Sequence, residues 1–469
     1  MGAGSALGAA GELGFVSVVE DGVAGVDGLR GAERAAVSPD GKHVYVTGFS
    51  DNALAAFSRN PSTGRLSFVD LWRDGVDGVD GLAAPQGVVV SPDGKQVYAA
   101  SFADDALVTF ARNPTSGRLT FVEQVKDGVG GVDGLNGANS VAVAPDGKHV
   151  YATGGSDDAV AAFARNPANG RLSFLGARKD GVGGVNGLDG AAGIVVAPNG
   201  KQVYVAATDE DALSTFSRNP TTGQLGFVTA LRDGFGGVDG LDGPEFLAIP
   251  PDGEQVYATG FLDDSVSTFS RNPTTGRLGF LGLVKDGVGG VDGLDAAFGI
   301  AASADGKHVY AAGISDNAIV AFARDPSGGG LTPVDLLKDG VDGVDGLGGA
   351  RGVIVSPDGK HVYATSGSDN AVATFARDLT APPVTILLGA TIRPRKGIAR
   401  FRFTAADDLD PSDALTFRCA LDDQKPAACS SPKTLRNLEP GRHRFEVRAQ
   451  DSFGNLDATA EAKSFRIKR

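Results

Sequence analysis

Short apolar runs alternate with polar turns along most of this chain. In one stretch the runs are GVVVS (Gly87–Ser91), QVYAAS (Gln96–Ser101), ALVTFAR (Ala106–Arg112) and RLTFVEQV (Arg118–Val125). SPDGK, a polar bend at Asp104-Asp105 and NPTSG separate them. The runs are too short for ordinary helices, and Pro-Asp-Gly and Asn-Pro are turn-forming words. The pattern predicts four antiparallel strands in this stretch.

The same pattern recurs at a fixed period of 53 residues. The tyrosines of the chain mark it: Tyr45, Tyr98, Tyr151, Tyr204, Tyr257, Tyr310 and Tyr363. A long fixed period indicates stacked supersecondary units, and four short strands per unit are typical of a β-propeller blade. We therefore predict an all-β, seven-bladed β-propeller.

The two ends of the repeat region predict how the ring closes. GELGFVSVVEDG (Gly11–Gly22) matches GRLSFVDLWRDG (Gly64–Gly75), the fourth strand of a later repeat, at the same offset of 53. The last repeat stops at Arg377 without a fourth strand of its own. We expect the N-terminal strand to complete the seventh blade, which would remove the open edges of the ring.

The words SPDGKHVYVTG (Ser38–Gly48) and FSRNPTTGRLGF (Phe269–Phe280) resemble the YVTN-type repeats of the lactonase-like β-propeller family, over residues 11–377. The resemblance implies a seven-bladed propeller. Some members of that family are 6-phosphogluconolactonases or muconate-lactonising enzymes. Many others are surface or secreted proteins without an assigned role.

The last part of the chain has a different pattern. VTILLGATI, ARFRFTAAD, TFRCALDD and HRFEVRAQD alternate as strands, which predicts a small β-sandwich that resembles bacterial Ig-like modules. We expect a disordered N-terminus at 1–10, the propeller at 11–378, a linker at 379–384 and the sandwich at 385–469. Cys419 and Cys429, the two cysteines of the chain, predict one disulfide there, with two free thiols as the alternative.

Charge and composition narrow the class of protein. The net charge is −14, and the first 379 residues carry 27 Lys and Arg against 46 Asp and Glu. This balance argues against nucleic acid as a partner and favours a basic protein or cell-surface partner. No apolar run approaches the ~18 residues of a membrane span, and no signal peptide is visible. The disulfide suggests a secreted or surface protein.

The blades are joined by seven copies of a loop such as DGVGGVDGL, rich in Gly and Asp and built on threes. A curled loop could bring Asp oxygens to Ca²⁺ distance; an extended one could not. Alternatively, Val288, Val291 and Leu294 and their equivalents plug the seams between blades, and Gly-Asp steps supply the turns. The candidate Ca²⁺ ligands are Asp21, Asp27, Asp74, Asp80, Asp127, Asp133, Asp180, Asp233, Asp239, Asp286, Asp292, Asp339 and Asp345.

One position in the first strand of each repeat varies while its surroundings stay nearly constant. It holds Glu33, Gln86, Asn139, Ala192, Glu245, Phe298 and Arg351, and the next position includes Arg34 and Phe246. These residues should line the mouth of the central channel, where propellers bind ligands. The mixture suits a small polar ligand, and Glu33 could pair with Arg351; neutral drift at a solvated rim is the alternative. The candidate ligand-binding residues are Glu33, Arg34, Gln86, Asn139, Glu245, Phe246, Phe298 and Arg351.

The sequence favours binding over catalysis. His43, His149, His308 and His361 all follow Gly-Lys in a turn where other repeats have Gln, which suggests surface strand residues on the basic face. No family catalytic residue can be carried over, although Glu33, Glu245 and Arg351 could supply acid, base and anion clamp. We predict a surface binding or scaffold protein with calcium on its acidic face. The alternatives are a lactonase-like hydrolase acting at the channel mouth and a structural array component.

Overall fold

The computed structural model describes residues 13–377, 389–405, 415–422, 424–450, 457 and 460–468. The chain divides into two compact units, one spanning Phe15–Ala376 and the other including Arg377–Arg469. The predicted N-terminal segment 1–10 and linker 379–384 lie outside the described residues. Within the described residues, no helix has the length and apolarity needed to span a bilayer.

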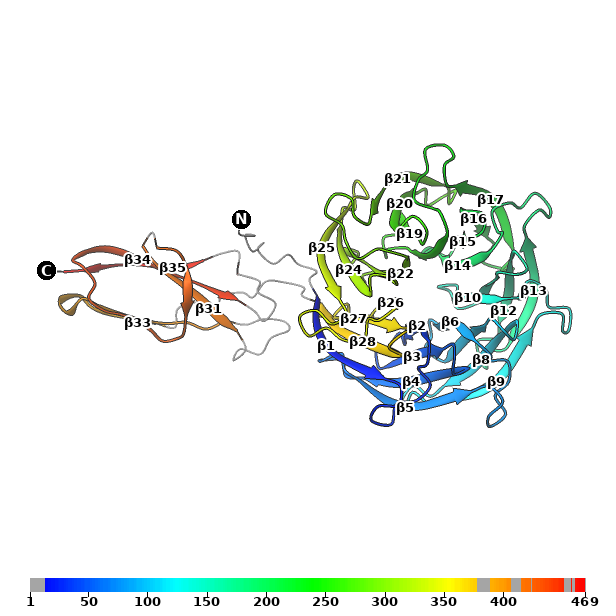
Figure 1. Ribbon diagram of the computed structural model, residues 1–469, viewed down its shortest axis with the longest axis horizontal. Coiled ribbons are helices and arrows are strands. Elements are labelled where there is room, and N and C mark those ends of the chain that lie inside the picture. The colour runs from blue at the N-terminus through cyan, green and yellow to red at the C-terminus, as the bar shows by residue number, and fades with distance from the viewer. Residues whose placement is uncertain are drawn as a thin grey trace. The chain divides into compact units, whose positions relative to one another are not determined.

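Seven four-stranded antiparallel sheets form the first unit and surround a common axis (Figure 1). Blades one to three are β2 (Ala32–Val37), β3 (His43–Gly48), β4 (Ala53–Arg59), β5 (Leu66–Arg73); β6 (Pro85–Val90), β7 (Gln96–Ser101), β8 (Ala106–Arg112), β9 (Leu119–Lys126); and β10 (Ala138–Val143), β11 (His149–Gly154), β12 (Ala159–Arg165), β13 (Leu172–Lys179).

Blades four to six repeat this order. They are β14 (Ala191–Val196), β15 (Gln202–Ala207), β16 (Ala212–Arg218), β17 (Leu225–Arg232); β18 (Pro244–Ala248), β19 (Gln255–Gly260), β20 (Ser265–Arg271), β21 (Leu278–Lys285); and β22 (Ala297–Ala302), β23 (His308–Gly313), β24 (Ala318–Arg324), β25 (Leu331–Lys338).

The seventh blade closes the ring with strands from both ends of the repeat region. Its sheet order is β1-β28-β27-β26, with β26 (Ala350–Val355), β27 (His361–Ser366), β28 (Ala371–Arg377) and the N-terminal β1 (Leu13–Glu20) outermost. The predicted seven blades and the predicted closure by the N-terminal strand are confirmed. Closure pairs an edge that would otherwise be open.

The apolar core lies between blades. The second strand of every blade is buried along its whole length, and its tyrosine enters the neighbouring cluster. Tyr45, for example, packs with Leu82, Val97 and Phe110 of the next blade, and Tyr363 packs with Val44 and Phe57 across the closure. Adjacent blades therefore share one core at each junction, because a single sheet cannot cover both of its own faces.

A buried arginine crosses each junction on the opposite face from the Gly-Asp loops. Arg112 donates Nη2 to both Asp40 carboxylate oxygens at 2.9 and 3.0 Å, Nε to the Tyr45 hydroxyl at 3.0 Å and Nη1 to the Gly94 carbonyl at 2.8 Å. Arg165 and Arg218 repeat these contacts, and Arg59 makes them with Asp358 across the closure. The crossing arginines are buried in the junctions, although charged residues at the end of a strand are usually exposed.

The histidines of the Gly-Lys-His turns belong to the same junctions. In three of them, Nδ1 lies 2.7 Å from Nη2 of the crossing arginine: His43, His149 and His361. A guanidinium can only donate, so Nδ1 is the acceptor and the ring is neutral. The expectation of surface histidines was wrong: the side chains are buried, His361 to 1% exposure. Gln96 replaces His because its Oε1 accepts from Arg165 in the same way.

The second unit contains two sheets with a shared aromatic core. One sheet holds β29 (Gly389–Arg393), β30 (Ile398–Arg402) and β33 (Lys433–Leu435), with a 3₁₀ turn η1 (Pro394–Lys396) after β29. The other, in sheet order, holds β32 (Ala427–Cys429), β31 (Thr416–Leu421), β34 (Gly441–Gln450) and β35 (Glu461–Ile467). Phe401, Phe445 and Phe465 pack between them. The predicted disulfide is present and joins β31 to β32. The strands fit a small sandwich, and the Ig-like assignment stays a prediction.

The neutral junction histidines make stability depend on pH. Burial, together with the Arg59 guanidinium, lowers the pKa of His361 to about 4. The unfolded chain has a histidine pKa of ~6.5, so it binds more protons than the native protein between pH 4 and 6.5. Stability should therefore fall as pH drops through this window, by about 2 kcal/mol at pH 5 from this residue alone.

The His361→Gln variant provides the check, because Gln is the residue that other blades use at this position. We expect its melting temperature at pH 7.5 to stay close to wild type and its loss between pH 7.5 and pH 5 to be smaller by several degrees. Thermal unfolding at the two pH values measures both quantities. An equal loss in variant and wild type would show that His361 does not carry the effect.

Candidate functional site

The first strand of each blade lies nearest the axis and carries the varying positions (Figure 1). We call these positions and the ones that follow them the inner ring: Glu33, Arg34, Gln86, Gly87, Asn139, Ser140, Ala192, Gly193, Glu245, Phe246, Phe298, Gly299, Arg351 and Gly352. In every blade the pairing of the first two strands shifts register across this point, between Ala32 and Ala35 in blade one. A β-bulge at this point frees the inner-ring residues from the regular ladder and re-aims their side chains.

Threonines on the second strand stabilise the bulges of alternate blades. Thr47 Oγ1 accepts the Arg34 amide at 3.0 Å and donates to the Gln86 carbonyl of the next blade at 2.9 Å. Thr153, Thr259 and Thr365 make the equivalent pairs of bonds, and Thr365 reaches the Glu33 carbonyl across the closure. At four of the seven junctions the backbone of the inner ring is thus held from blade to blade, independently of the side chains it presents.

Arg34 crosses the centre of the ring. From blade one it donates Nη1 to Ser140 Oγ and Nη2 to Asn139 Oδ1 on blade three, both at 2.9 Å. Its guanidinium carbon also lies 3.6 Å from the centroid of the Phe246 ring on blade five. Burial lowers the pKa of Arg34 to about 10, opposed by the charges of Glu33 and Glu245. This one side chain therefore ties three blades together at the axis. The sequence did not indicate Ser140 as its partner.

Glu33 and Arg351 form an ion pair across the junction of blades one and seven. Arg351 Nη1 lies 2.6 Å from Glu33 Oε2, with the glutamate buried and the arginine side chain 38% exposed. Arg351 also lies near the Phe298 ring, which packs edge-on against Phe246 with centroids 4.9 Å apart. Burial raises the pKa of Glu33, although Arg351 and Arg34 act in the opposite direction.

Glu245 is the second carboxyl group of the ring, and its acidity is also altered by its surroundings. Burial raises its pKa to about 7, and the Arg34 guanidinium opposes this effect, while the Glu33 carboxylate adds to it. Among the described residues, no side chain donates a hydrogen bond to its carboxylate. A half-buried carboxyl that titrates near neutrality, beside two arginines, is suited to accepting and returning a proton.

The Gly-Asp loops curl into successive turns. In the first copy, the Gly22 amide donates to the Val26 carbonyl at 2.9 Å and the Val26 amide to the Val23 carbonyl at 3.0 Å, with Gly25 and Gly28 at positive φ. The leading Asp21 accepts the Leu29 amide at 3.0 Å. All seven leading aspartates make this bond, at 2.9 to 3.1 Å.

The loop apolar residues divide into two groups. Val291 and Leu294 are buried in the seam, as the structural alternative predicts, and so are their counterparts Val26 and Leu29. Val288 is not a seam residue: it is 60% exposed, and the equivalent residue of every other copy is also exposed. The first triplet forms the tip of the turn, which has no neighbouring blade to pack against.

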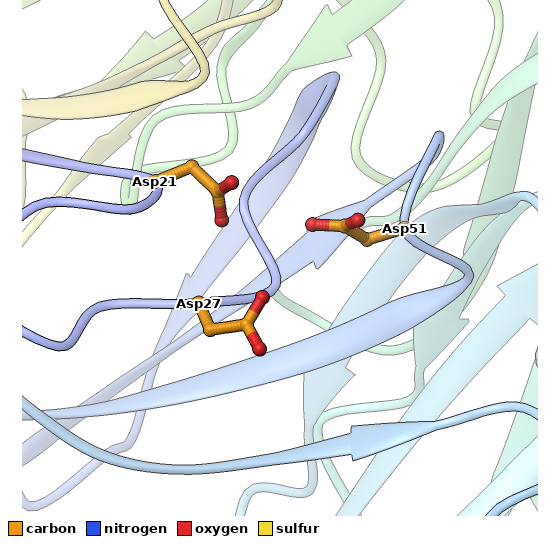
Figure 2. A group of neighbouring side chains, drawn as sticks. All are labelled: Asp21, Asp27 and Asp51. Carbon is orange, nitrogen blue, oxygen red and sulfur yellow. The ribbon is translucent and has the colours of Figure 1, made fainter.

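The structure brings carboxylates of the loop and of the following bend together in four blades. Figure 2 shows Asp21, Asp27 and Asp51 with their carboxylates turned toward a common space. The corresponding groups are Asp127, Asp133 and Asp157; Asp233, Asp239 and Asp263; and Asp286, Asp292 and Asp316. Asp74 with Asp80, and Asp339 with Asp345, do not form such groups in the described part of the chain. Asp180 has Asn186 as its partner position.

A basic side chain from the fourth strand of the same blade already reaches these groups. Lys179 Nζ lies 2.7 Å from Asp133 and 3.0 Å from Asp157, and Lys338 Nζ lies 3.0 Å from both Asp292 and Asp316. The Asp133 carboxylate raises the pKa of Lys179. The sequence carried this signal, since Lys or Arg precedes the leading Asp of six copies; the first copy has Glu20 instead. A metal ion at any of the four groups would displace a side-chain cation, which is Arg73, Lys179, Lys285 or Lys338, and calcium stays a prediction.

The comparisons with known proteins identify the family. A model of the lactonase seven-bladed β-propeller family matches residues 8–130, 136–288 and 237–386. The chain belongs to this family. Among curated proteins, no significant relative was found. The family match favours the hydrolase alternative over the scaffold role that we had preferred.

Solved structures agree on the fold. A putative 6-phosphogluconolactonase from Bacteroides uniformis is 22% identical, with a TM-score of 0.52 over 65% of this chain and 87% of its own. The periplasmic gluconolactonase PpgL of Pseudomonas aeruginosa is 19% identical, with a TM-score of 0.54 over 66% and 86%. Kuenenia stuttgartiensis hydrazine synthase also matches, at 15% identity and a TM-score of 0.55 over 76% and 99%. At these identities the likeness concerns the fold alone.

The leading aspartates should stabilise the fold through the Oδ1 that accepts a backbone amide of the loop, whether or not a metal binds. In Asp286→Ala the Leu294 amide, 3.0 Å from Asp286 Oδ1, loses its acceptor in a buried seam, at a cost of about 1–3 kcal/mol. Asp286→Asn keeps an acceptor and should lose little, as should Asp292→Ala at an exposed ion pair. Thermal unfolding of the three variants measures this. Equal losses for Asn and Ala at 286 would contradict it.

The role of calcium can be measured on the same protein. If the Lys and Arg side chains are the only cations at the Asp groups, the thermal melts in EDTA and in excess Ca²⁺ should superimpose. Selective binding of Ca²⁺ to the native state predicts a rise of about 4 kcal/mol at a thousandfold excess over Kd.

Proposed function

We propose that this protein hydrolyses a lactone at the inner ring. The observation that carries the proposal is the acidity of Glu245. Burial raises the pKa of this half-buried carboxyl to about 7, although the positive charges of Arg34 and Arg351 lie close enough to oppose that rise. The family match supports the same reaction class. Placement of the protein in an oxidising compartment, suggested by the Cys419–Cys429 disulfide, is part of the proposal.

The chemistry assigns a role to each group. The ionised Glu245 accepts a proton from a water molecule as the water oxygen attacks the lactone carbonyl. Arg351, held by Glu33 and still exposed along part of its side chain, stabilises the negative charge that develops on the carbonyl oxygen. Collapse of the tetrahedral intermediate breaks the ring C–O bond, and the leaving alkoxide takes the proton back from Glu245. The products are a hydroxy acid and the regenerated carboxylate.

Phe298 and Phe246 supply the apolar part of the site. Their edge-on packing presents a small aromatic surface beside Arg351. Such a mixture of aromatic surface and few polar groups suits a small, partly apolar ring with a polar carbonyl. Arg34 donates hydrogen bonds from both terminal nitrogens to Asn139 and Ser140. Its role is therefore to connect the blades at the inner ring and to supply a positive charge there.

The first test is the activity of Glu245→Gln on a panel of γ- and δ-lactones, followed by pH-stat titration of the acid released. Loss of the general base should lower kcat/KM by about 10²–10⁴-fold. Glu254→Gln, at an exposed turn position, is the matched control and should keep wild-type activity. An active wild type with an unaffected Glu245→Gln variant would remove Glu245 from the mechanism; an inactive wild type on the whole panel would overturn the proposal.

The pH dependence gives an independent check. Because Glu245 must be ionised to act as a base, kcat/KM should rise with pH and reach half of its plateau near pH 7. A profile that is flat between pH 5.5 and 8.5 would exclude a carboxyl with this pKa as the base.

A further inference from the structure

The outer face of one sheet in the second unit carries an unusual row of arginines. Along β34, Arg442, Arg444, Glu446 and Arg448 point to this face, because the alternate residues Phe445, Val447 and Ala449 are buried in the core. On the neighbouring strands, Arg466 lies directly opposite Arg442, and Arg418 lies directly opposite Arg448. Like charges in directly opposite positions of a sheet are unfavourable on their own.

The arginines of this face differ in the partners that the chain gives them. Arg418 Nε donates to the neutral side-chain oxygen of Gln450 at 3.0 Å, and Arg448 Nη1 donates to the Asp457 carbonyl at 3.0 Å. Arg444 pairs with Glu446. In the described part of the chain, no acidic side chain lies within ion-pair distance of Arg442 or Arg466. The face therefore keeps a net positive charge.

An open cleft of about 700 Å³ lies at the Arg442 end of this face. Arg442, Arg444, Arg466, His443 and Ser464 line it, together with Asp422 and Phe465. The Asp422 carboxylate is already occupied, since it binds His443 Nδ1 at 2.9 Å and accepts the Arg444 amide at 2.8 Å. His443 Nε2 lies 2.8 Å from the Glu439 carbonyl, and these two acceptors favour the charged imidazolium.

We propose that this face binds a linear acidic polysaccharide, with the cleft at Arg442 and Arg466 as its principal anion site. Planar guanidinium groups bind carboxylate, sulfate and phosphate groups in pairs of hydrogen bonds. The two arginine pairs are six residues apart on β34, about 20 Å in an extended strand, so one small anion cannot contact both. A polymer with anionic groups along its length can.

The composition of the face favours a polysaccharide over nucleic acid. Its other residues are small or polar, including Thr416, Ala420, Ala462 and Ser464, while the phenylalanines of this unit lie in the core. Single-stranded nucleic acid is usually bound by stacking on exposed aromatic rings, which this face lacks. The net charge of −14 on the whole chain also opposes a ligand with the charge density of a duplex. An acidic polysaccharide can bind through its hydroxyl and anionic groups without aromatic stacking, and its charges are more widely spaced than those of a duplex.

The test uses the full-length protein with polygalacturonate as the probe and neutral dextran as the control polymer. Wild type should bind polygalacturonate, with an affinity that falls as salt rises, and should not bind dextran. The Arg442→Ala/Arg466→Ala variant should bind at least about tenfold more weakly and show a smaller salt dependence. The matched variant Arg400→Ala/Arg402→Ala removes two exposed arginines of the other sheet and should stay within about twofold of wild type.

Further arms separate this site from its alternatives. Digalacturonate is too short to span the two pairs, so it should bind far more weakly than the polymer. Equal losses in both double variants would show that only net charge matters and would overturn the site. Tighter binding of duplex DNA than of polygalacturonate, or self-association of the protein that the arginine variant abolishes in the absence of polymer, would replace the polysaccharide with another partner. Thermal melts confirm that the variants remain folded.

Discussion

An arginine that crosses from each blade into the preceding one is the interaction on which the ring depends. Its charge lies in an apolar junction, where an unpaired guanidinium would be very costly. Arg112 avoids that cost through the Asp40 carboxylate, the Tyr45 hydroxyl and the Gly94 carbonyl, which belong to two turns and a core side chain. All of these partners must arrive at fixed positions, and this requirement explains why the period stays at 53 residues. Blade four has Asn199 in place of the aspartate, and there Arg271 keeps the Tyr204 hydroxyl, the Gly253 carbonyl and the Gln202 side-chain oxygen as its acceptors.

Because the junctions are held on one face by arginines and on the other by the leading aspartates, the inner ring is free to vary. Its backbone forms a bulge in every blade, and at four junctions Thr47 and its equivalents hold it through bonds that involve no inner-ring side chain. Seven nearly identical blades can therefore present seven different residues at the axis. Because the blades are held together by the same contacts, the side chains at the centre can differ from blade to blade. The acids, arginines and aromatic rings there come from different blades.

Much of this architecture could be predicted from the sequence, because period and alternation report directly on strands. The predicted strands at Gln96–Ser101 and Ala106–Arg112 match β7 and β8 residue for residue. The junction histidines were misjudged for a physical reason: His361 alternates with Gln in the repeat, which resembles a surface position, but the shared property is an acceptor for a buried arginine. The path of Arg34 to Asn139 and Phe246 joins residues more than a hundred positions apart, and no local pattern contains that information.

The inner ring contains two glutamates and two arginines, yet the four are not two equivalent pairs. Arg351 gives its hydrogen bond to Glu33, and Arg34 gives both terminal nitrogens to the neutral side chains of Asn139 and Ser140. The charges of Arg34 and Arg351 therefore lower the pKa of Glu245, but neither arginine donates a hydrogen bond to it. Burial has the larger effect and raises the pKa. A ring built only to bind an ion or to hold the blades together gains nothing from a carboxyl left in this condition. A ring that must take a proton near neutral pH and give it back gains the group it needs, while Glu33 keeps Arg351 in place beside it.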